Sequence, residues 1–275
     1  KERLSWGIPL PFDPNYVTYV WFDALTNYLS IPRSLEKESE LWPADIHVIG
    51  KDILKFHAVY WPIMLKAAGL ELPKQILVHG WWQKDGKKMS KSDGNVVDPV
   101  TVIDDWGLDA FRYYVVRELD IGPDGNWTDE GFAKRYGAEL ANGLGNLINR
   151  SLSMLGRYRD GIVPEPHYEL ANEATEARDK LLEQLRANEL QAGLMTIWGY
   201  IARLNQYVDE TAPFKMAKDP DQAERLGEVL YNLTESCRLL GVWLQPYLPS
   251  TSRKIMEQLN LPTDTVNIAE SGWGE

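Results

Sequence analysis

The chain of 275 residues is poor in cysteine, and this limits its disulfide and metal chemistry. Its single thiol, Cys237, can form no disulfide within the chain and no Cys-x-x-Cys zinc site. The four histidines, His47, His57, His79 and His167, do not make up for the missing cysteines. We therefore expect a reducing compartment and no structural metal.

Long apolar runs and an excess of basic residues are also missing. No stretch approaches the roughly 18 uninterrupted apolar residues of a membrane span, and no basic segment followed by an apolar run opens the chain. A soluble, cytoplasmic protein without a membrane partner is expected. Because 29 basic residues face 40 acidic ones, with a net charge of −11, any contact with nucleic acid must be local.

The apolar fraction of 44% and the charged fraction of 25% fit one large domain or two ordinary ones. The chain opens at Lys1 without an initiator methionine. We expect a truncated or processed fragment.

The first part of the chain predicts an α/β arrangement. Three short runs rich in β-branched and aromatic residues, 16–22, 46–49 and 76–79, predict buried strands. Between the last two, residues 53–68 predict a helix that ends at Gly69. The order strand, helix, strand favours a parallel sheet whose ligands bind beyond the carboxyl ends of its strands.

From about residue 131 the periodicity is helical. Apolar residues recur in steps of three and four from Leu190 to Val208 and from Leu226 to Leu244, and a third seam runs from Leu140 to Leu155. A bundle of at least four helices is the economical arrangement. We expect α/β plus all-α organisation in three parts: 1–96, the second half of a Rossmann-like domain; 97–130, a connector; and 131–275, an antiparallel helical bundle.

A lysine-rich segment follows the third predicted strand. Asp85-Gly86 predicts a hairpin turn, and Lys84, Lys87, Lys88 and Lys91 lie on either side of it. Mobile ammonium groups at this position would stabilise the charge that develops on a leaving pyrophosphate. Judged on composition alone, a solvated hairpin is the simpler alternative.

The pentapeptide at 88–92, Lys-Met-Ser-Lys-Ser, resembles the nucleotide-loop signature of class I aminoacyl-tRNA synthetases. Segments 19–28, 47–53 and 56–62 are similar to methionyl-tRNA synthetases, and the resemblance extends over essentially the whole chain. It begins in the middle of the family's pattern. The resemblance implies activation of methionine by ATP, with Mg²⁺ expected, and transfer of the methionyl group to tRNA(Met).

The resemblance implies a methionine pocket on the predicted helix and on the segment before it. Its residues would be Trp21, Ala24, Leu25, Tyr28, Ile53, Phe56, His57 and Trp61. The last four are spaced so that they share one helix face, and aromatic walls suit a thioether. The alternative is a core stripe on a crossover helix.

The resemblance also assigns the nucleotide site. Gly50 and Asp52 would face the adenosine, and Lys88 and Lys91 would act in catalysis by stabilising the pyrophosphate. ATP would also contact the intervening and following loop residues Met89, Ser90 and Ser92. For Asp52 a plain helix N-cap is the alternative.

A stripe of Asn142, Asn146, Asn149 and Arg150 lies beside the third apolar seam. Amides and a guanidinium suit unstacked RNA bases, and the resemblance makes Asn146 and Arg150 the anticodon-reading pair. Phe214 stands where the family usually has a base-stacking tryptophan. A solvated helix edge is the alternative.

Several family features are missing. No histidine lies in a His-x-Gly-His segment, and the zinc-bearing insertion is absent. We therefore expect that this chain alone is catalytically incompetent and that the missing N-terminal half is a partner. The alternatives are a non-catalytic tRNA-binding module, one half of a split synthetase, or, less favoured, another class I synthetase such as a leucyl, valyl or cysteinyl enzyme.

Overall fold

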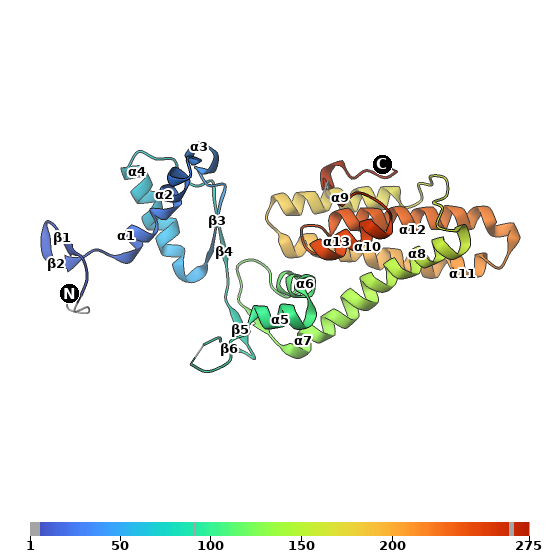
Figure 1. Ribbon diagram of the computed structural model, residues 1–275, viewed down its shortest axis with the longest axis horizontal. Coiled ribbons are helices and arrows are strands. Elements are labelled where there is room, and N and C mark those ends of the chain that lie inside the picture. The colour runs from blue at the N-terminus through green and yellow to red at the C-terminus, as the bar shows by residue number, and fades with distance from the viewer. Residues whose placement is uncertain (1–5, 91, 264–266, 275) are drawn as a thin grey trace. The chain divides into compact units, whose positions relative to one another are not determined.

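The computed structural model describes residues 6–90, 92–263 and 267–274 and divides the chain into two compact units, 1–81 and 82–275 (Figure 1). The first unit is mixed α/β, and the second is mainly helical with one small sheet. None of the described helices is long and apolar enough to cross a membrane.

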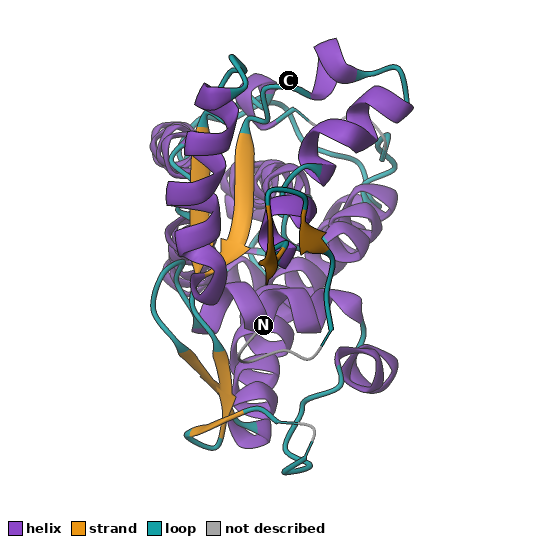
Figure 2. Ribbon diagram, turned by 90° about the vertical axis from the view of Figure 1, so that its left-hand side faces the viewer, coloured by secondary structure: helices purple, strands orange, loops and turns teal. Residues whose placement is uncertain are grey.

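The first unit contains two separate pairs of strands, drawn as arrows in Figure 2. Its elements are β1 (Pro9–Leu10), β2 (Asp13–Val17), α1 (Val20–Ala24), α2 (Asn27–Ser34), α3 (Glu38–Leu41), β3 (Ile46–Gly50), η1 (Lys51–Ile53), η2 (Phe56–Tyr60), α4 (Trp61–Ala67) and β4 (Gln75–His79). Strands β3 and β4 are parallel, with Ile46 opposite Gln75 and Gly50 opposite His79. The predicted strand–helix–strand order is confirmed for this part of the chain.

The buried strand expected over 16–22 is wrong. The strand β2 ends at Val17, and α1 begins at Val20. Tyr16, Val20 and Phe22 are each more than 60% exposed. An apolar run of this length satisfies either a strand or a short helix, so periodicity could not separate the two.

The second unit begins with the lysine-rich hairpin. Its elements up to the helices are β5 (Trp82–Lys84), β6 (Lys87–Lys88), α5 (Pro99–Trp106), α6 (Leu108–Glu118) and β7 (Gly125–Trp127). Strand β5 pairs with β6 in antiparallel and with β7 in parallel fashion. Strand β7 lies in the segment 97–130, which was expected to be a connector. Its pairing with β5 attaches the hairpin to the rest of the second unit.

Helices make up the rest of this unit. They are α7 (Asp129–Arg135), η3 (Tyr136–Gly145), α8 (Asn146–Arg159), α9 (Ala171–Arg186), α10 (Leu190–Thr211), α11 (Pro213–Met216), η4 (Pro220–Gln222), α12 (Ala223–Trp243), α13 (Pro249–Gln258) and η5 (Ile268–Glu270). The first three form one continuous helical stretch (Figure 1). Helix α12 packs against α8, α10 and α13. The predicted seam of α10 is buried from Leu194 to Val208, whereas Leu190 is exposed. The seam of α12 is buried throughout, with Leu226 and Leu230 in a second cluster beside α8.

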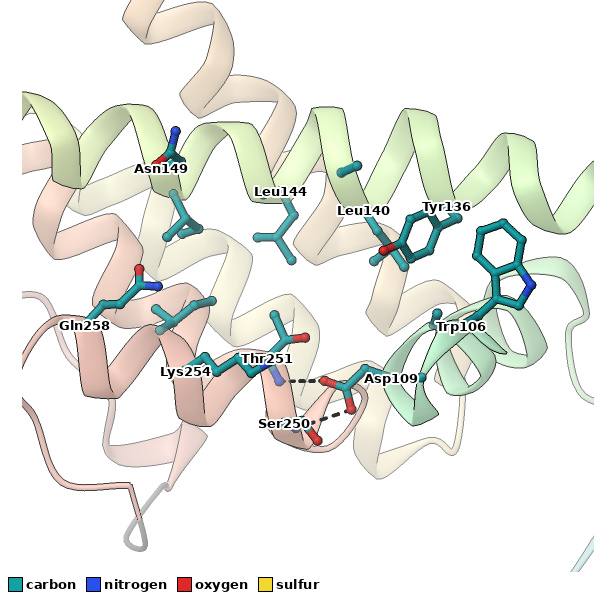
Figure 3. Close-up of a pocket in the computed structure, with 16 residues that line it drawn as sticks. Trp106, Asp109, Tyr136, Leu140, Leu144, Asn149, Ser250, Thr251, Lys254 and Gln258 are labelled. Carbon is teal, nitrogen blue, oxygen red and sulfur yellow. Dashed lines mark hydrogen bonds between the residues drawn. The ribbon is translucent and has the colours of Figure 1, made fainter. Parts of the chain in front are cut away.

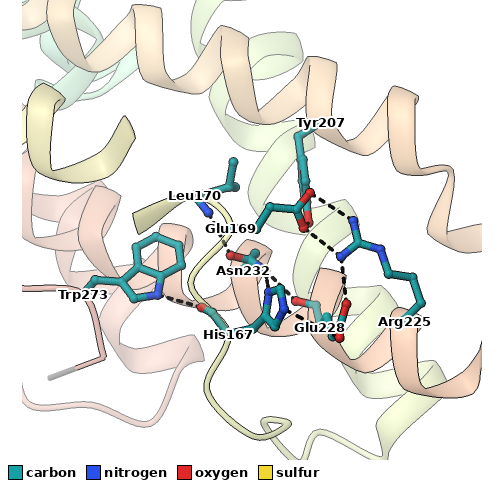
Figure 4. A network of polar contacts seen from close by, with 8 residues as sticks. All are labelled: His167, Glu169, Leu170, Tyr207, Arg225, Glu228, Asn232 and Trp273. Carbon is teal, nitrogen blue, oxygen red and sulfur yellow. Dashed lines mark hydrogen bonds and ion pairs between the residues drawn. The ribbon is translucent and has the colours of Figure 1, made fainter. Parts of the chain in front are cut away.

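A polar network connects the loop before α9 to α10 and α12 (Figure 4). The Asn232 side chain is fully buried; its Oδ1 accepts from the backbone N–H of Leu170, and its Nδ2 lies 3.1 Å from Nδ1 of His167. Glu169 accepts hydrogen bonds from Tyr207 and Arg225. These hydrogen bonds satisfy polar groups whose burial between packed helices would otherwise cost free energy.

Candidate functional site

The predicted methionine residues form an aromatic cluster in the first unit. Trp21 stacks on Phe56, with ring centroids 4.6 Å apart and an interplanar angle of 9°. Trp61 and Leu25 are 1% exposed and belong to one core cluster with Trp21 and Phe56. The spacing of Phe56, His57 and Trp61 therefore does bring their side chains to one region, although a π-helical turn, η2, runs through it.

Hydrogen bonds orient the polar groups of this cluster. The Nδ1 of His57 lies 3.0 Å from the Ile53 carbonyl oxygen, so the N–H is on Nδ1 and donates to this oxygen. The hydroxyl of Tyr28 lies 3.0 Å from Nε2 of His57, within hydrogen-bond distance. Burial raises the pKa of Tyr28, which keeps the hydroxyl protonated. These two contacts fix the orientation of the His57 ring among the aromatic side chains.

His47, on β3, is a cluster member that sequence reasoning did not select. It is 4% exposed, and its ring lies 4.2 Å from that of Tyr28. The indole N–H of Trp61 donates to Nε2 of His47 over 3.3 Å. Burial, and secondarily the charge of His57, lower the pKa of His47. Its position in the predicted strand 46–49 and in the similar segment 47–53 was the signal that the sequence offered.

The side chains of two members of the predicted set make none of the contacts described above. Ala24 is half-buried and its carbonyl accepts from the Asn27 side chain, while Ile53 takes part through its backbone oxygen. Beside the cluster lies an apolar pocket of about 260 Å³ lined by Tyr19, Trp21, Phe22, Leu25, Tyr60, Ile63 and Met64. Only Trp21 and Leu25 are common to this lining and to the predicted set.

Gly50 and Asp52 lie where β3 ends and η1 begins. Gly50 is the N-cap residue of η1, and no side chain caps this helix. Asp52 lies inside η1, so the N-cap alternative for Asp52 is wrong. A Cβ at Gly50 would lie 2.7 Å from Oδ1 of Asp52. The glycine thus leaves room for a carboxylate folded back over the carboxyl end of the parallel strand pair.

The hairpin predicted at Asp85-Gly86 is confirmed. Both residues have positive φ, 52° and 73°, as a two-residue turn of this type requires. The turn is attached to β7, because the Gly86 N–H donates to Oδ1 of Asn126 over 2.7 Å.

Beyond the hairpin, Asn95 lies beside Lys88 and Ser90. The Asn95 side chain accepts from the Ser90 N–H at 2.8 Å and donates to the Lys88 carbonyl at 3.0 Å. The hydroxyls of Ser90 and Ser92 are 2.7 Å apart, and Met89 packs against the core of the second unit. Lys91, one of the two predicted catalytic lysines, lies outside the described residues.

The predicted anticodon residues lie on α8 and α11. Asn142, Asn146 and Asn149 are exposed, and Arg150 forms a long ion pair, 3.5 Å, with Asp209 near the end of α10. Phe214 follows a left-handed turn at Ala212 and is 43% exposed. The ion pair therefore brings Arg150 to the end of α10 that leads into α11.

A larger cavity in the second unit was not foreseen. It measures about 560 Å³ and lies between the start of α6, the stretch η3–α8, and α13 (Figure 3). Its apolar wall includes Leu140 and Leu144, while Asp109 accepts from the Ser250 and Thr251 amides at the start of α13. Among the described residues, no group of three histidine, cysteine or acidic side chains could hold a metal ion.

Comparison with known proteins agrees with the resemblance seen in the sequence. Residues 1–152, more than half of the chain, match the family described as tRNA synthetases class I (M). Methionine–tRNA ligase of Clostridium tetani is 47% identical over 96% of the chain and 43% of its own length. That of Bacillus subtilis is 47% identical over 98% of the chain and 42% of its own length.

Solved structures give the same result. Mycobacterium tuberculosis methionyl-tRNA synthetase in complex with methionyl-adenylate matches 99% of the chain and 56% of its own chain, with a TM-score of 0.87 and 38% identity. Its apo form matches with a TM-score of 0.83 and 36% identity. The chain thus spans less than half the length of these curated relatives. Since the family model and the relatives together account for nearly its full length, the chain belongs to the methionyl branch of the class I tRNA synthetases.

Proposed function

We propose that the protein to which these 275 residues belong joins methionine to ATP and then transfers the methionyl group to tRNA(Met). In the first step the methionine carboxylate attacks the α-phosphorus of ATP, methionyl-adenylate forms, and the bond to pyrophosphate breaks. In the second step the tRNA hydroxyl displaces AMP. The observation that carries the proposal is the aromatic cluster around the Tyr28–His57 hydrogen bond.

That cluster suits a methionine side chain. Flat aromatic faces such as those of Trp21 and Phe56 attract a polarisable thioether, and the contact contributes about 0.3–1.5 kcal/mol. The oriented Tyr28–His57 pair offers a polar edge that a purely aliphatic pocket lacks. We propose that Trp21, Ala24, Leu25, Tyr28, Ile53, Phe56, His57 and Trp61 select methionine.

The proposed nucleotide residues lie in two segments of the sequence, 50–52 and 88–92. Gly50 and Asp52 would receive the adenosine at the end of the parallel strands, the general ligand position in such sheets. The loop residues Lys88, Met89, Ser90, Lys91 and Ser92 would receive the phosphates, and the two lysines would stabilise the departing pyrophosphate. Mg²⁺ would enter with the ATP phosphates.

The helices of the second unit are proposed to read the anticodon. Asn146 and Arg150 would contact bases through their amide and guanidinium groups, and Phe214 would stack on a base. The pair with Asp209 supports this role, because it holds the guanidinium beside the segment that carries Phe214. The division into 1–96, 97–130 and 131–275 is the corresponding proposal for the domains.

We infer further that a polypeptide of these 275 residues alone does not form the adenylate. It contains no His-x-Gly-His segment, the family's other nucleotide signature, and correct positioning of both reactants supplies much of the rate enhancement. Methionine-dependent pyrophosphate exchange at the rate of an intact synthetase would contradict this inference.

A titration with tRNA tests the proposal. We expect the chain to bind tRNA with a CAU anticodon more tightly than the same tRNA with one anticodon base changed, and Arg150→Ala to abolish this preference. Arg157→Ala, an exposed arginine on the same helix, is the matched control and should weaken both complexes equally. Equal affinity of the unmodified chain for both tRNAs would contradict anticodon reading.

A further inference from the structure

We propose that Asn95 is the positioning residue of the lysine-rich loop: its side-chain amide holds the backbone on both sides of Met89 and thereby sets how Lys88 and Ser90 meet a polyphosphate. This inference rests on the proposed function of that loop.

The amide makes two complementary bonds. Its Oδ1 accepts from the Ser90 N–H at 2.8 Å, and its Nδ2 donates to the Lys88 carbonyl at 3.0 Å. Because one partner is a donor and the other an acceptor, only a side chain that offers both groups satisfies them together. Asparagine does so, whereas aspartate keeps only the acceptor.

Met89, which lies between the two hydrogen-bonded residues, is also held through its own side chain. Met89 packs against the cluster that contains Tyr114, Trp127 and Phe132. The backbone from Lys88 to Ser90 is therefore held by a partly buried side chain and by an amide, while the Lys88 side chain itself is exposed. Such an arrangement limits the movement of the backbone without covering the ammonium group.

A turn before Asn95 leads the chain back toward β6. The Asp93 N–H donates to the Ser90 carbonyl over 3.2 Å, and Gly94 has a φ of 65°, a conformation that glycine adopts without strain. This return brings Asn95 back beside Lys88. The attachment at Asn126 is separate, because it holds the preceding hairpin turn through Gly86.

Amide hydrogen exchange in the 275-residue chain tests the hydrogen bond from the Ser90 N–H to Asn95 directly. In Asn95→Ala we expect the Ser90 amide to exchange about five to ten times faster, since one hydrogen bond is lost. Asn95→Asp should restore its protection by keeping an acceptor. Asn126→Ala is the matched control and should expose Gly86 but not Ser90. Unchanged Ser90 exchange in Asn95→Ala would overturn the proposal.

Binding of inorganic tripolyphosphate supplies the functional readout. Asn95→Ala should weaken it by about fivefold or more, whereas Asn126→Ala should not. Faster Ser90 exchange with unchanged tripolyphosphate affinity would overturn the positioning role. If the unmodified chain binds no tripolyphosphate, the proposed function of the loop fails and its positioning role fails with it; exchange at Ser90 would still report the hydrogen bond separately.

Discussion

His47 lies buried within the aromatic cluster, where its charged form is disfavoured. Burial, and then the charge of His57, lower its pKa from the ordinary value of 6.5. A base whose pKa is lower in the folded than in the unfolded state stabilises the fold above the unfolded pKa, and this contribution is lost as the pH falls through the folded pKa.

We therefore expect the melting temperature of the first unit to fall as the pH is lowered from 7.5 to about 5. Thermal unfolding followed by tryptophan fluorescence checks this, since Trp42 and Trp61 lie beside the His47 ring. His47→Asn should flatten the dependence, while the exposed control His79→Asn should keep it. A His47→Asn variant with the full pH dependence would show that another group is responsible.

Glu139 is the acceptor for three neighbours in the second unit. Tyr113 donates to it through its hydroxyl, and the Arg117 and Arg135 guanidinium groups donate over 3.0 and 2.6 Å. Burial opposes ionisation of the carboxyl, but the hydrogen bonds from Tyr113 and Arg135 and the charges of both arginines outweigh it and lower the pKa of Glu139.

Glu139→Gln should reduce the free energy of unfolding by about 2–3 kcal/mol, because Arg117 loses its counter-charge and Arg135 keeps only its ion pair with Glu118. Urea denaturation followed by circular dichroism measures this. Glu183→Gln, an exposed residue on α9, should change it by less than about 0.5 kcal/mol. Similar losses in both variants would mean that the cluster around Glu139 contributes little.

Among the elements, α9 and α10 approach closely at one glycine. A Cβ at Gly193 would collide with the Tyr247 hydroxyl and lie 3.2 Å from Leu181. That hydroxyl donates to the Leu190 carbonyl at 3.0 Å. Only a residue without a side chain leaves this hydrogen bond and the packing intact.

Gly193→Ala should therefore destabilise the protein by about 1–3 kcal/mol through overpacking. Gly199→Ala on the same helix is the matched control: nothing lies within 4 Å of its Cβ position, so better helix propensity should add about 0.5–1 kcal/mol. The melting temperatures should move in opposite directions. A stabilising Gly193→Ala would show that Tyr247 moves aside at no cost.

At the scale of the whole molecule, the two units differ in their cores. The helices of the second unit bury a large apolar cluster, whereas the first unit has three fully buried residues in its main cluster and exposes Trp6, Phe12 and Phe22. Since burial of apolar surface is the main source of stability, the units should differ in stability.

We expect two unfolding transitions in calorimetry, with the first unit melting at the lower temperature. Tryptophan fluorescence and far-ultraviolet circular dichroism should then give different midpoints, because the second unit carries most of the helices. A polypeptide of residues 82–275 should retain the upper transition. A single transition with coincident midpoints would contradict independent units.

What the sequence determined by itself was local or periodic. The Asp85-Gly86 turn follows from two residues that tolerate positive φ, and the seams of α10 and α12 follow from steps of three and four. The shared face of His57 and Trp61 follows from helical spacing. These features depend on neighbours within a few positions along the chain, and such neighbours can be identified in the sequence.

What only the tertiary structure decided depends on residues far apart in the chain. His47 contacts the aromatic cluster through Trp61, and Asn126 binds the hairpin turn. Strand β7 pairs with β5 and so attaches the lysine-rich segment to the rest of the second unit. The run at 16–22 was assigned wrongly for the same reason. Packing against other elements, which an apolar run does not reveal, determines whether it forms a strand or a helix.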